Sequence, residues 1–242
     1  MSKENSNKTL MPWITAILMV VGLAVLAAMY WNRNVTVQDL EVNELRYTTY
    51  EEVKQAAAIP PEVKPDSLDL SGVSMRVEKL NYVKSVVPYV EPNGTLRLSI
   101  KERIPVALLV HGKDRAYVDA EGVRLPILDK PSPDVPLLYG YRTSGSDTLN
   151  GESFKQLSQF LVQAQADPFS WTTLSELAYD KMDGVVALSH ENGVKLIFGH
   201  NNFELKLENW KAFYHQVIKT KGIDAMRQVD LRFTNQVVTR EI

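Results

Sequence analysis

The strongest constraint on this chain is a long apolar segment near its N-terminus. Residues 10–31, LMPWITAILMVVGLAVLAAMYW, contain no charged side chain. As a helix this segment would be roughly 33 Å long, which matches the hydrocarbon core of a bilayer. Trp13 lies near one end and Trp31 at the other, as in the aromatic belts of membrane helices. The pattern predicts a single transmembrane helix over residues 10–31.

A cleaved secretory signal is the alternative, because Val25-Leu26-Ala27 is a tolerable cleavage sequence. The apolar segment is longer than the apolar region of a signal peptide, which has about 7–15 residues, so a retained anchor is favoured. Lys3 and Lys8 precede the segment, whereas Arg33 is the nearest charge behind it. This bias predicts a cytoplasmic tail, residues 1–9, and places the bulk of the chain outside the cytoplasm.

Composition narrows the function classes for the rest of the chain. The formal net charge is −2, and Lys and Arg are scattered, so no basic stripe of the kind that binds nucleic acid is present. The absence of cysteine excludes disulfide frameworks, zinc-thiolate sites and thiol catalysis. Hydrophobic residues make up 45 % and charged residues 23 %, which is ordinary for a folded protein. We therefore expect folded domains and no nucleic-acid partner.

Residues 33–104 have the pattern of a small α+β unit. VTVQDLEV (35–42) has strand character, and Thr49-Tyr50-Glu51-Glu52 is a capping-box sequence that opens a short helix. Asp69 or Ser71 is placed to cap a second helix. Apolar residues at helical spacing predict its buried face: Leu70, Val73, Val77 and Leu80.

Two alternating apolar runs, VKSVVPYV and TLRLSIKER, follow this helix and flank Asn93-Gly94, which is a strong hairpin signal. The predicted order is therefore strand, helix, helix, strand, strand, which is the order of POTRA modules. Residues 79–109, KLNYVKSVVPYVEPNGTLRLSIKERIPVALL, resemble a stretch of the FtsQ/DivIB family of bacterial cell-division proteins. The residues that match the family pattern are Leu80, Val83, Pro92, Asn93, Glu102, Arg103, Pro105 and Ala107.

Residues 105–242 read as a mostly antiparallel β domain with two helices. Hairpins are predicted at Asp119–Gly122 and at Asn192-Gly193, and both fit the resemblance. One helix is expected over ESFKQLSQFLVQAQAD and another over about 203–220. The last strand is expected over residues 228–238 as an open edge, and the apolar residues that align on the two helices are Phe154, Leu157, Leu161, Leu207, Trp210, Tyr214 and Val217.

No arrangement typical of an enzyme appears in the sequence. The four histidines are isolated, and there is no HExxH, P-loop, dinucleotide-binding or G-x-S-x-G pattern. We therefore expect no metal site, cofactor, small-molecule substrate or catalytic residue. Two readings of Glu102-Arg103-Ile104-Pro105 stay open: a structural brace, in which Arg103 bonds carbonyls or a carboxylate, and a partner contact. The structural reading is favoured.

The resemblance implies a non-catalytic scaffold of the septation machinery in the cell inner membrane, with a cytoplasmic N-terminus and enrichment at the division septum. In the family such a protein recruits FtsB- and FtsL-type division proteins and other septal components. Carried onto this sequence, the partner-binding residues are Arg232, Phe233, Asn235 and Gln236. The chain departs from the family here, because Phe233 replaces a Tyr, Gln236 replaces a common Gly, and a Trp near the family's C-terminus has no counterpart.

An open terminal strand suits this function, because its unpaired backbone groups accept an added strand. Two alternatives from other classes stay open. One is a POTRA-containing scaffold of outer-membrane assembly, which usually has repeated modules and a barrel. The other is a membrane-anchored periplasmic enzyme whose site assembles from scattered residues, and it would need a deep pocket lined by titratable groups.

Overall fold

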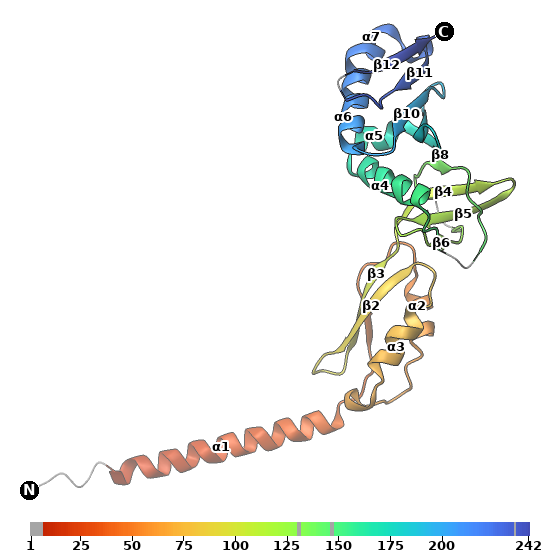
Figure 1. Cartoon of the computed structure of the whole chain (residues 1–242). Helices are drawn as coiled ribbons and strands as arrows, with labels where there is room; N and C mark the ends of the chain where they lie inside the picture. Colours follow the sequence, from red (N-terminus) through yellow and green to blue (C-terminus); the bar gives the residue numbers. More distant parts are fainter. Residues whose placement is uncertain (1–6, 130–131, 146–147, 235) are drawn as a thin grey trace, which may run out of the picture. The chain divides into compact units, whose positions relative to one another are not determined.

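The computed structural model describes residues 7–129, 132–145, 148–234 and 236–242, with side chains in the first helix described for 13–26. One helix, α1 (Asn7–Asn34), covers the whole apolar segment (Figure 1). Within the described part of the chain, no helix has both the length and the apolar character needed to cross a membrane. Residues 1–6 of the predicted cytoplasmic tail lie outside the described residues, as do the side chains at both ends of the predicted span.

The chain divides into two compact units, Met1–Glu102 and Arg103–Ile242, which are described separately below. Beyond α1, the first unit is a small α+β fold. Its strands form a three-stranded sheet in the order β1-β3-β2, with β1 and β3 parallel and β2 and β3 antiparallel. Helices α2 and α3 cover one side of this sheet (Figure 1). The elements are β1 (Leu40–Val42), α2 (Tyr50–Ala57), the 3-10 turn η1 (Pro65–Ser67), α3 (Leu70–Val77), β2 (Val83–Val90) and β3 (Leu96–Glu102).

The caps predicted from the sequence are present in the first unit. The Thr49 hydroxyl accepts a hydrogen bond from the backbone N–H of Glu52, and the Glu52 carboxylate accepts one from the backbone N–H of Thr49. Asp69 caps α3 by accepting from Gly72. The strand prediction over 35–42 was wrong in extent, because the backbone N–H of Val37 donates to Val63 (2.8 Å) and the chain joins the sheet only at β1.

The Glu-Arg-Ile-Pro element is held by side chains within each unit. Glu102 accepts hydrogen bonds from three consecutive backbone N–H groups, those of residues 46–48. Arg103 donates to the buried carboxylate of Asp119 (2.7 Å) and to Glu121 (3.2 Å). Burial by itself lowers the pKa of Arg103, but these two carboxylates outweigh burial and raise it. Arg103 is thus bonded to a carboxylate, as the structural reading expected, but both of its partners belong to the second unit and the bracing of a junction stays a prediction.

The second unit is built on a nine-stranded sheet with the order β12-β11-β10-β9-β8-β7-β4-β5-β6. The sheet is mixed, since β4 and β7, β7 and β8, and β10 and β11 pair in parallel and the other neighbours are antiparallel. Its strands are β4 (Pro105–His111), β5 (Asp114–Asp119), β6 (Arg124–Leu125), β7 (Leu137–Leu138), β8 (Leu174–Asp180), β9 (Gly184–Ser189), β10 (Lys195–Gly199), β11 (Met226–Asp230) and β12 (Val238–Glu241).

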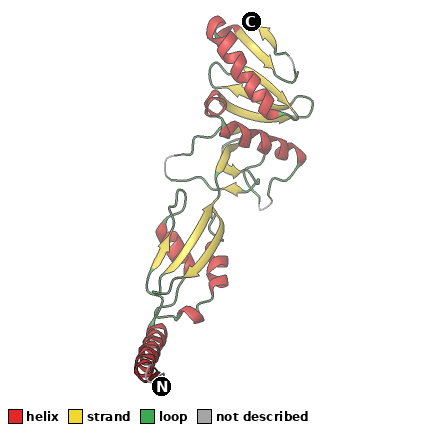
Figure 2. Ribbon diagram, turned by 90° about the vertical axis from the view of Figure 1, so that its left-hand side faces the viewer, coloured by secondary structure: helices red, strands yellow, loops and turns green. Residues whose placement is uncertain are grey.

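Helices cover one face of this sheet and supply much of its core (Figure 2). Both predicted helices are present, and Trp210, Phe160 and Phe198 are among the largest fully buried side chains. Burying such apolar and aromatic groups is the main source of stability in a unit of this size. The helical elements are α4 (Glu152–Ala166), α5 (Pro168–Thr173), α6 (Phe203–Phe213), the π-helical η2 (Tyr214–Ile218), α7 (Lys219–Lys221) and the 3-10 turn η3 (Ile223–Ala225).

Candidate partner-binding site

The C-terminal end of the chain forms two strands instead of the single strand predicted over 228–238. β11 ends at Asp230, and β12 (Val238–Glu241) pairs antiparallel with β11 after the β11–β12 connection (231–237). The prediction of one strand was therefore wrong, and β11 is an internal strand. β12 forms this edge of the sheet, and β6 forms the opposite edge.

Asp230 explains why the strand stops. Its carboxylate accepts a hydrogen bond from the backbone N–H of Arg232 (3.1 Å), which bends the chain two residues after the aspartate. The same carboxylate accepts from the Arg232 side chain through Nε (2.9 Å) and Nη2 (2.6 Å). These local bonds compete with continued pairing along the alternating sequence.

The sheet edges differ in whether their outward-facing backbone groups already have hydrogen-bond partners. At the β2 edge, α3 and its C-cap residue occupy both backbone polar groups of Val86: Glu78 accepts from its N–H (3.1 Å) and the Ser74 hydroxyl donates to its carbonyl (3.0 Å). Pro88, two residues further on the same edge, has no N–H to offer. This edge is thus blunted against strand addition.

The remaining two edges have fewer such contacts. The Tyr50 hydroxyl donates to the Leu40 carbonyl of β1 (3.2 Å). Beside β6, the Arg124 guanidinium donates to the carbonyl of Arg142 (2.9 Å) and the Leu149 N–H donates to the Gly122 carbonyl (2.9 Å), but neither bond uses the backbone groups of β6 itself. In the described structure, β12 lies at the end of its sheet with no strand or covering segment hydrogen-bonded along its outer side.

The hydrogen-bond parity of the strands identifies which groups of β12 face outward. The Leu231 N–H donates to the Ile197 carbonyl of β10 (2.9 Å). Successive residues of a strand direct their backbone N–H and C=O groups to opposite sides, so Gln228 and Asp230 direct theirs toward β12. There they pair with residues 240 and 238. The Ile242 N–H, which donates to Ala225 (3.1 Å), fits the same parity. Thr239 and Glu241 therefore direct their N–H and C=O groups away from the sheet.

The residues predicted to bind a partner lie in the β11–β12 connection. Phe233 is 43 % exposed, Gln236 is exposed, and the Arg232 side chain is 37 % exposed. Asn235 lies outside the described residues. The structure thus places three of these four side chains in the segment that leads into the open edge, rather than within a strand.

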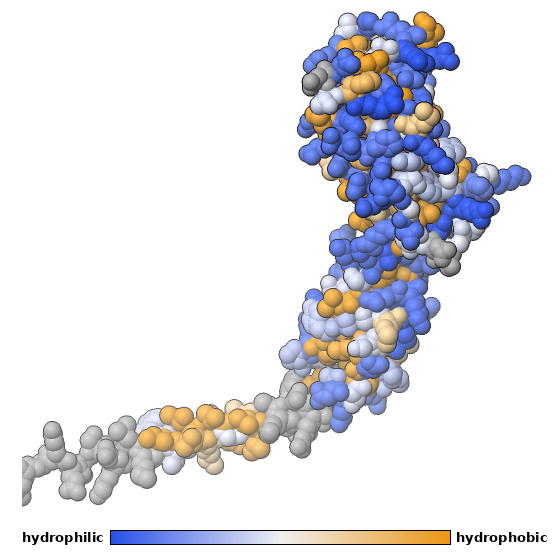
Figure 3. Space-filling model, in the orientation of Figure 1, coloured by the Kyte–Doolittle hydropathy of each residue, from blue (hydrophilic) through white to orange (hydrophobic). Residues whose placement is uncertain are grey.

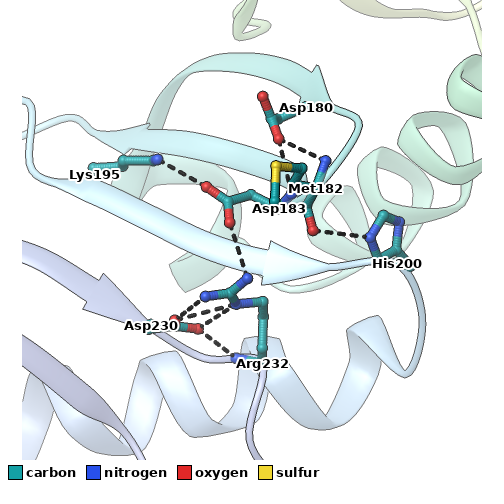
Figure 4. A network of polar contacts seen from close by, with 7 residues as sticks. All are labelled: Asp180, Met182, Asp183, Lys195, His200, Asp230 and Arg232. Atoms are coloured by element: carbon teal, nitrogen blue, oxygen red, sulfur yellow. Dashed lines mark hydrogen bonds and ion pairs between the residues drawn. The ribbon is translucent and has the colours of Figure 1, made fainter.

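A network of charged groups surrounds Arg232 on neighbouring strands and turns (Figure 4). Asp183, in the β8–β9 turn, accepts from Arg232 Nη1 (2.9 Å) and from Lys195 Nζ (3.0 Å). Burial by itself raises the pKa of Asp230, but its hydrogen bonds with Arg232 outweigh burial and lower it. Hydrogen bonding to Asp230 raises the pKa of Arg232. Asp230 and Arg232 therefore both stay ionised at neutral pH.

Lys206 lies behind this network as a largely buried cation. Its ammonium donates to the carbonyl of Asn201 (2.6 Å), and burial lowers its pKa although the nearby Asp230 opposes that shift. Among the described residues, no group of three or more His, Cys, Asp or Glu side chains is placed to hold a metal ion. The described surface around Arg232 therefore consists of hydrogen-bonding and charged side chains.

Sequence reasoning missed Asp183, Lys195 and the two outward-facing residues of β12. The Asp-Gly dipeptide at 183–184 is a hairpin signal that could have located the β8–β9 turn. The position of this turn beside Arg232 depends on strand order, and no local signal reports it. β12 was missed because its few residues follow the expected strand without an intervening Gly or Pro.

The sequence comparisons identify the group of proteins to which these features belong. The family model "FtsQ/DivIB, C-terminal related" matches residues 104–240. A cell division protein FtsQ from Rhodothermus marinus is 32 % identical over 237 residues, covering 93 % of this chain and 86 % of its own length. A second FtsQ, from Salinibacter ruber, is 25 % identical over 237 residues, covering 92 % of this chain and 90 % of its own.

A structural comparison gives a weaker likeness. The extracytoplasmic domain of the division protein DivIB from Geobacillus stearothermophilus aligns with 49 % of this chain and 97 % of its own, at 18 % identity and a TM-score of 0.34. That score is too low to bear on the fold. The matches to FtsQ sequences cover most of this chain and most of each relative, and they show that this chain belongs to the FtsQ/DivIB family of bacterial cell-division proteins.

Proposed function

We propose that this protein is a non-catalytic scaffold of the septation machinery that binds an extended segment of an FtsB- or FtsL-type partner at the outer side of β12. The partner segment adds a tenth strand to the sheet, with hydrogen bonds to the outward backbone groups of Thr239 and Glu241. The observation that carries this proposal is the contrast between β12, which is open, and the edges of the first sheet, where side chains occupy backbone groups of β2 and β1.

Side chains next to β12 would give this addition its specificity. Arg232, Phe233 and Gln236 are exposed in the β11–β12 connection, and we propose that they contact the partner together with Asn235. Val238 is 42 % exposed on β12 itself. Backbone pairing supplies affinity for any extended chain, whereas an aromatic, an amide and a guanidinium discriminate between partner sequences.

The proposed scaffold is anchored in the cell inner membrane by residues 10–31, with residues 1–9 cytoplasmic, and is enriched at the septum. On the described part of α1, Trp13, Leu18 and Met19 are more than 60 % exposed. Figure 3 shows the apolar surface of this helix in orange. An exposed apolar helix of this kind needs an apolar environment to cover it. We further propose that residues 33–104 act as a POTRA-like domain and residues 105–242 as the partner-binding β domain.

Replacement of Thr239 tests strand addition directly. Thr239→Pro removes a backbone N–H that faces outward and leaves the bonds between β11 and β12 in place, so it should lower affinity for the partner more than tenfold. Thr239→Val keeps the N–H and the branched shape, so it should bind like the unchanged protein. The probe is the purified extracytoplasmic segment of the FtsB-type protein from the same organism, measured by calorimetry.

Circular dichroism and urea unfolding of both variants check that the sheet is intact. Equal affinity of Thr239→Pro and Thr239→Val would rule out addition at this edge. In that case the side-chain contacts of the β11–β12 connection would have to carry any binding.

A further inference from the structure

Hydrogen bonds within the β8–β9 turn fix the backbone that carries the Asp183 side chain. The Asp180 carboxylate accepts from the backbone N–H groups of Met182 (2.7 Å) and Asp183 (2.8 Å), which closes the turn. Hydrogen bonds from these two backbone groups lower the pKa of Asp180. His200 adds a contact between its Nε2 and the Met182 carbonyl (3.3 Å). These bonds fix the backbone from which the Asp183 side chain extends.

Asp183 lies between two cations, one on β10 and the other in the β11–β12 connection. One carboxylate oxygen accepts from Lys195 Nζ on β10, and the other accepts from Nη1 of Arg232 (Figure 4). The Asp183 side chain is 25 % exposed, against 41 % for Lys195 and 37 % for Arg232. Partial burial of the shared carboxylate makes its contacts stronger than those of an ion pair in open solvent.

The Arg232 guanidinium is hydrogen-bonded to two carboxylates and retains N–H groups that have no acceptor among the described residues. Nε and Nη2 donate to Asp230, while Nη1 donates to Asp183. A guanidinium has five N–H donors, so two of them have no acceptor among the described residues. Asp230 fixes one edge of the guanidinium plane, and Asp183 fixes Nη1. The two remaining N–H groups therefore point in a set direction on an exposed surface.

We infer that Asp183 is a positioning residue for partner recognition, which acts by orienting the guanidinium of Arg232 toward an acceptor on the bound chain. This inference rests on the proposed function, because it requires Arg232 to contact the partner. A long cationic side chain loses substantial rotamer entropy when it is ordered. Asp183 orders it before binding, so less of that entropy is lost when the partner arrives.

A double-mutant cycle on the full chain tests this inference with the FtsB-type segment as probe. Arg232→Ala should weaken binding about tenfold. Asp183→Ala should weaken it about fivefold, and Asp183→Asn, which keeps an acceptor for Nη1, should weaken it at most about twofold. In the Arg232→Ala background, Asp183→Ala should have no further effect, because the group that it positions is absent.

A matched control separates positioning from a general loss of surface charge. Glu191→Ala also removes one surface carboxylate, one that accepts from the Tyr214 hydroxyl (3.0 Å), and it should leave affinity unchanged. Unchanged binding by Asp183→Ala would overturn the inference, and so would an equal loss from Asp183→Ala with and without Arg232. Failure of strand addition appears separately, as equal binding by Thr239→Pro and Thr239→Val.

Discussion

Asp167 shows how one side chain joins two helices of the second unit. Its carboxylate caps α5 by accepting from the backbone N–H and hydroxyl of Ser170, and it also pairs with Lys211 Nζ of α6 (2.9 Å). Burial by itself raises the pKa of Asp167, but the hydrogen bonds from Ser170 and Lys211 outweigh burial and lower it to about 2. The ionised carboxylate is therefore the form that stabilises the fold.

This pKa predicts a pH-dependent contribution to stability. Because the pKa is lower in the folded chain than its ordinary value of 3.8, the contribution is complete above pH about 4 and is lost as pH falls through about 2. With allowance for solvent screening it amounts to about 1 kcal/mol. Asp167→Asn keeps the cap but not the charge, so its stability deficit in urea unfolding should be about 1 kcal/mol at pH 6 and vanish near pH 2. A deficit of the same size at both pH values would contradict this assignment.

Gly184 is a position where the backbone admits no side chain. Its φ is +72°, and an added Cβ would lie 2.2 Å from the carbonyl oxygen of Gly199. Gly193 has a similar φ of +57° with open space around it, which makes it a matched control. Gly193→Ala should cost about 1 kcal/mol for the left-handed backbone, and Gly184→Ala about 3 kcal/mol or more because the clash is added. Equal losses in urea unfolding would show that the approach to Gly199 relaxes without cost.

At the scale of elements, α3 both packs on the first sheet and closes its β2 edge. Ser74→Ala combined with Glu78→Ala leaves the Val86 N–H and C=O without their side-chain partners. We expect a loss of about 1–3 kcal/mol in the free energy of unfolding and increased self-association, because the freed edge resembles an unprotected strand. Glu51→Ala, in the first turn of α2, should cost only a few tenths of a kcal/mol. Light scattering that stays equal for the two variants would mean that Pro88 alone protects this edge.

Elements with a strong local signal were predictable from the sequence. The capping box at Thr49, the hairpins at Asn93-Gly94 and Asn192-Gly193, and the α4 face with Phe154 and Leu157 are all confirmed. These features depend on residues that are close together along the chain. Local spacing alone is therefore sufficient to specify them.

Elements defined by distant partners were not predictable. β7 has only two residues, Leu137 and Leu138, too few to show a period, and it exists because β4 and β8 lie on either side of it. The Asp183–Arg232 contact joins residues 49 positions apart. At the candidate site, the sequence was expected to form one strand where the structure has β11, a connection and β12, because no Gly or Pro marks the break. The contact of Asp183 with Arg232 depends on strand order, and no local signal reports it.

At the scale of the whole molecule, the two compact units suit a protein that connects a membrane to other proteins. Unit 1 contains the apolar helix α1 and a small sheet whose described edges carry protecting contacts. Unit 2 has a large helix-covered core and the open strand β12. The proposed anchor and the proposed partner-binding edge therefore lie in different units, and each can be removed by a change that leaves the other unit's core untouched.

This separation leads to a prediction for the full chain in cells. A fusion to a fluorescent protein that folds in the periplasm should form a midcell band and should remain in the membrane fraction after alkaline carbonate extraction. Deletion of residues 2–34 behind a cleavable export signal should release the protein into the periplasmic fraction, because the exposed apolar side chains of α1 are lost. Thr239→Pro should instead stay in the membrane fraction, since the change affects only the outer edge of β12. Release of the full-length fusion by carbonate would contradict an anchor at residues 10–31, whereas a membrane-bound fusion without a midcell band would contradict septal recruitment.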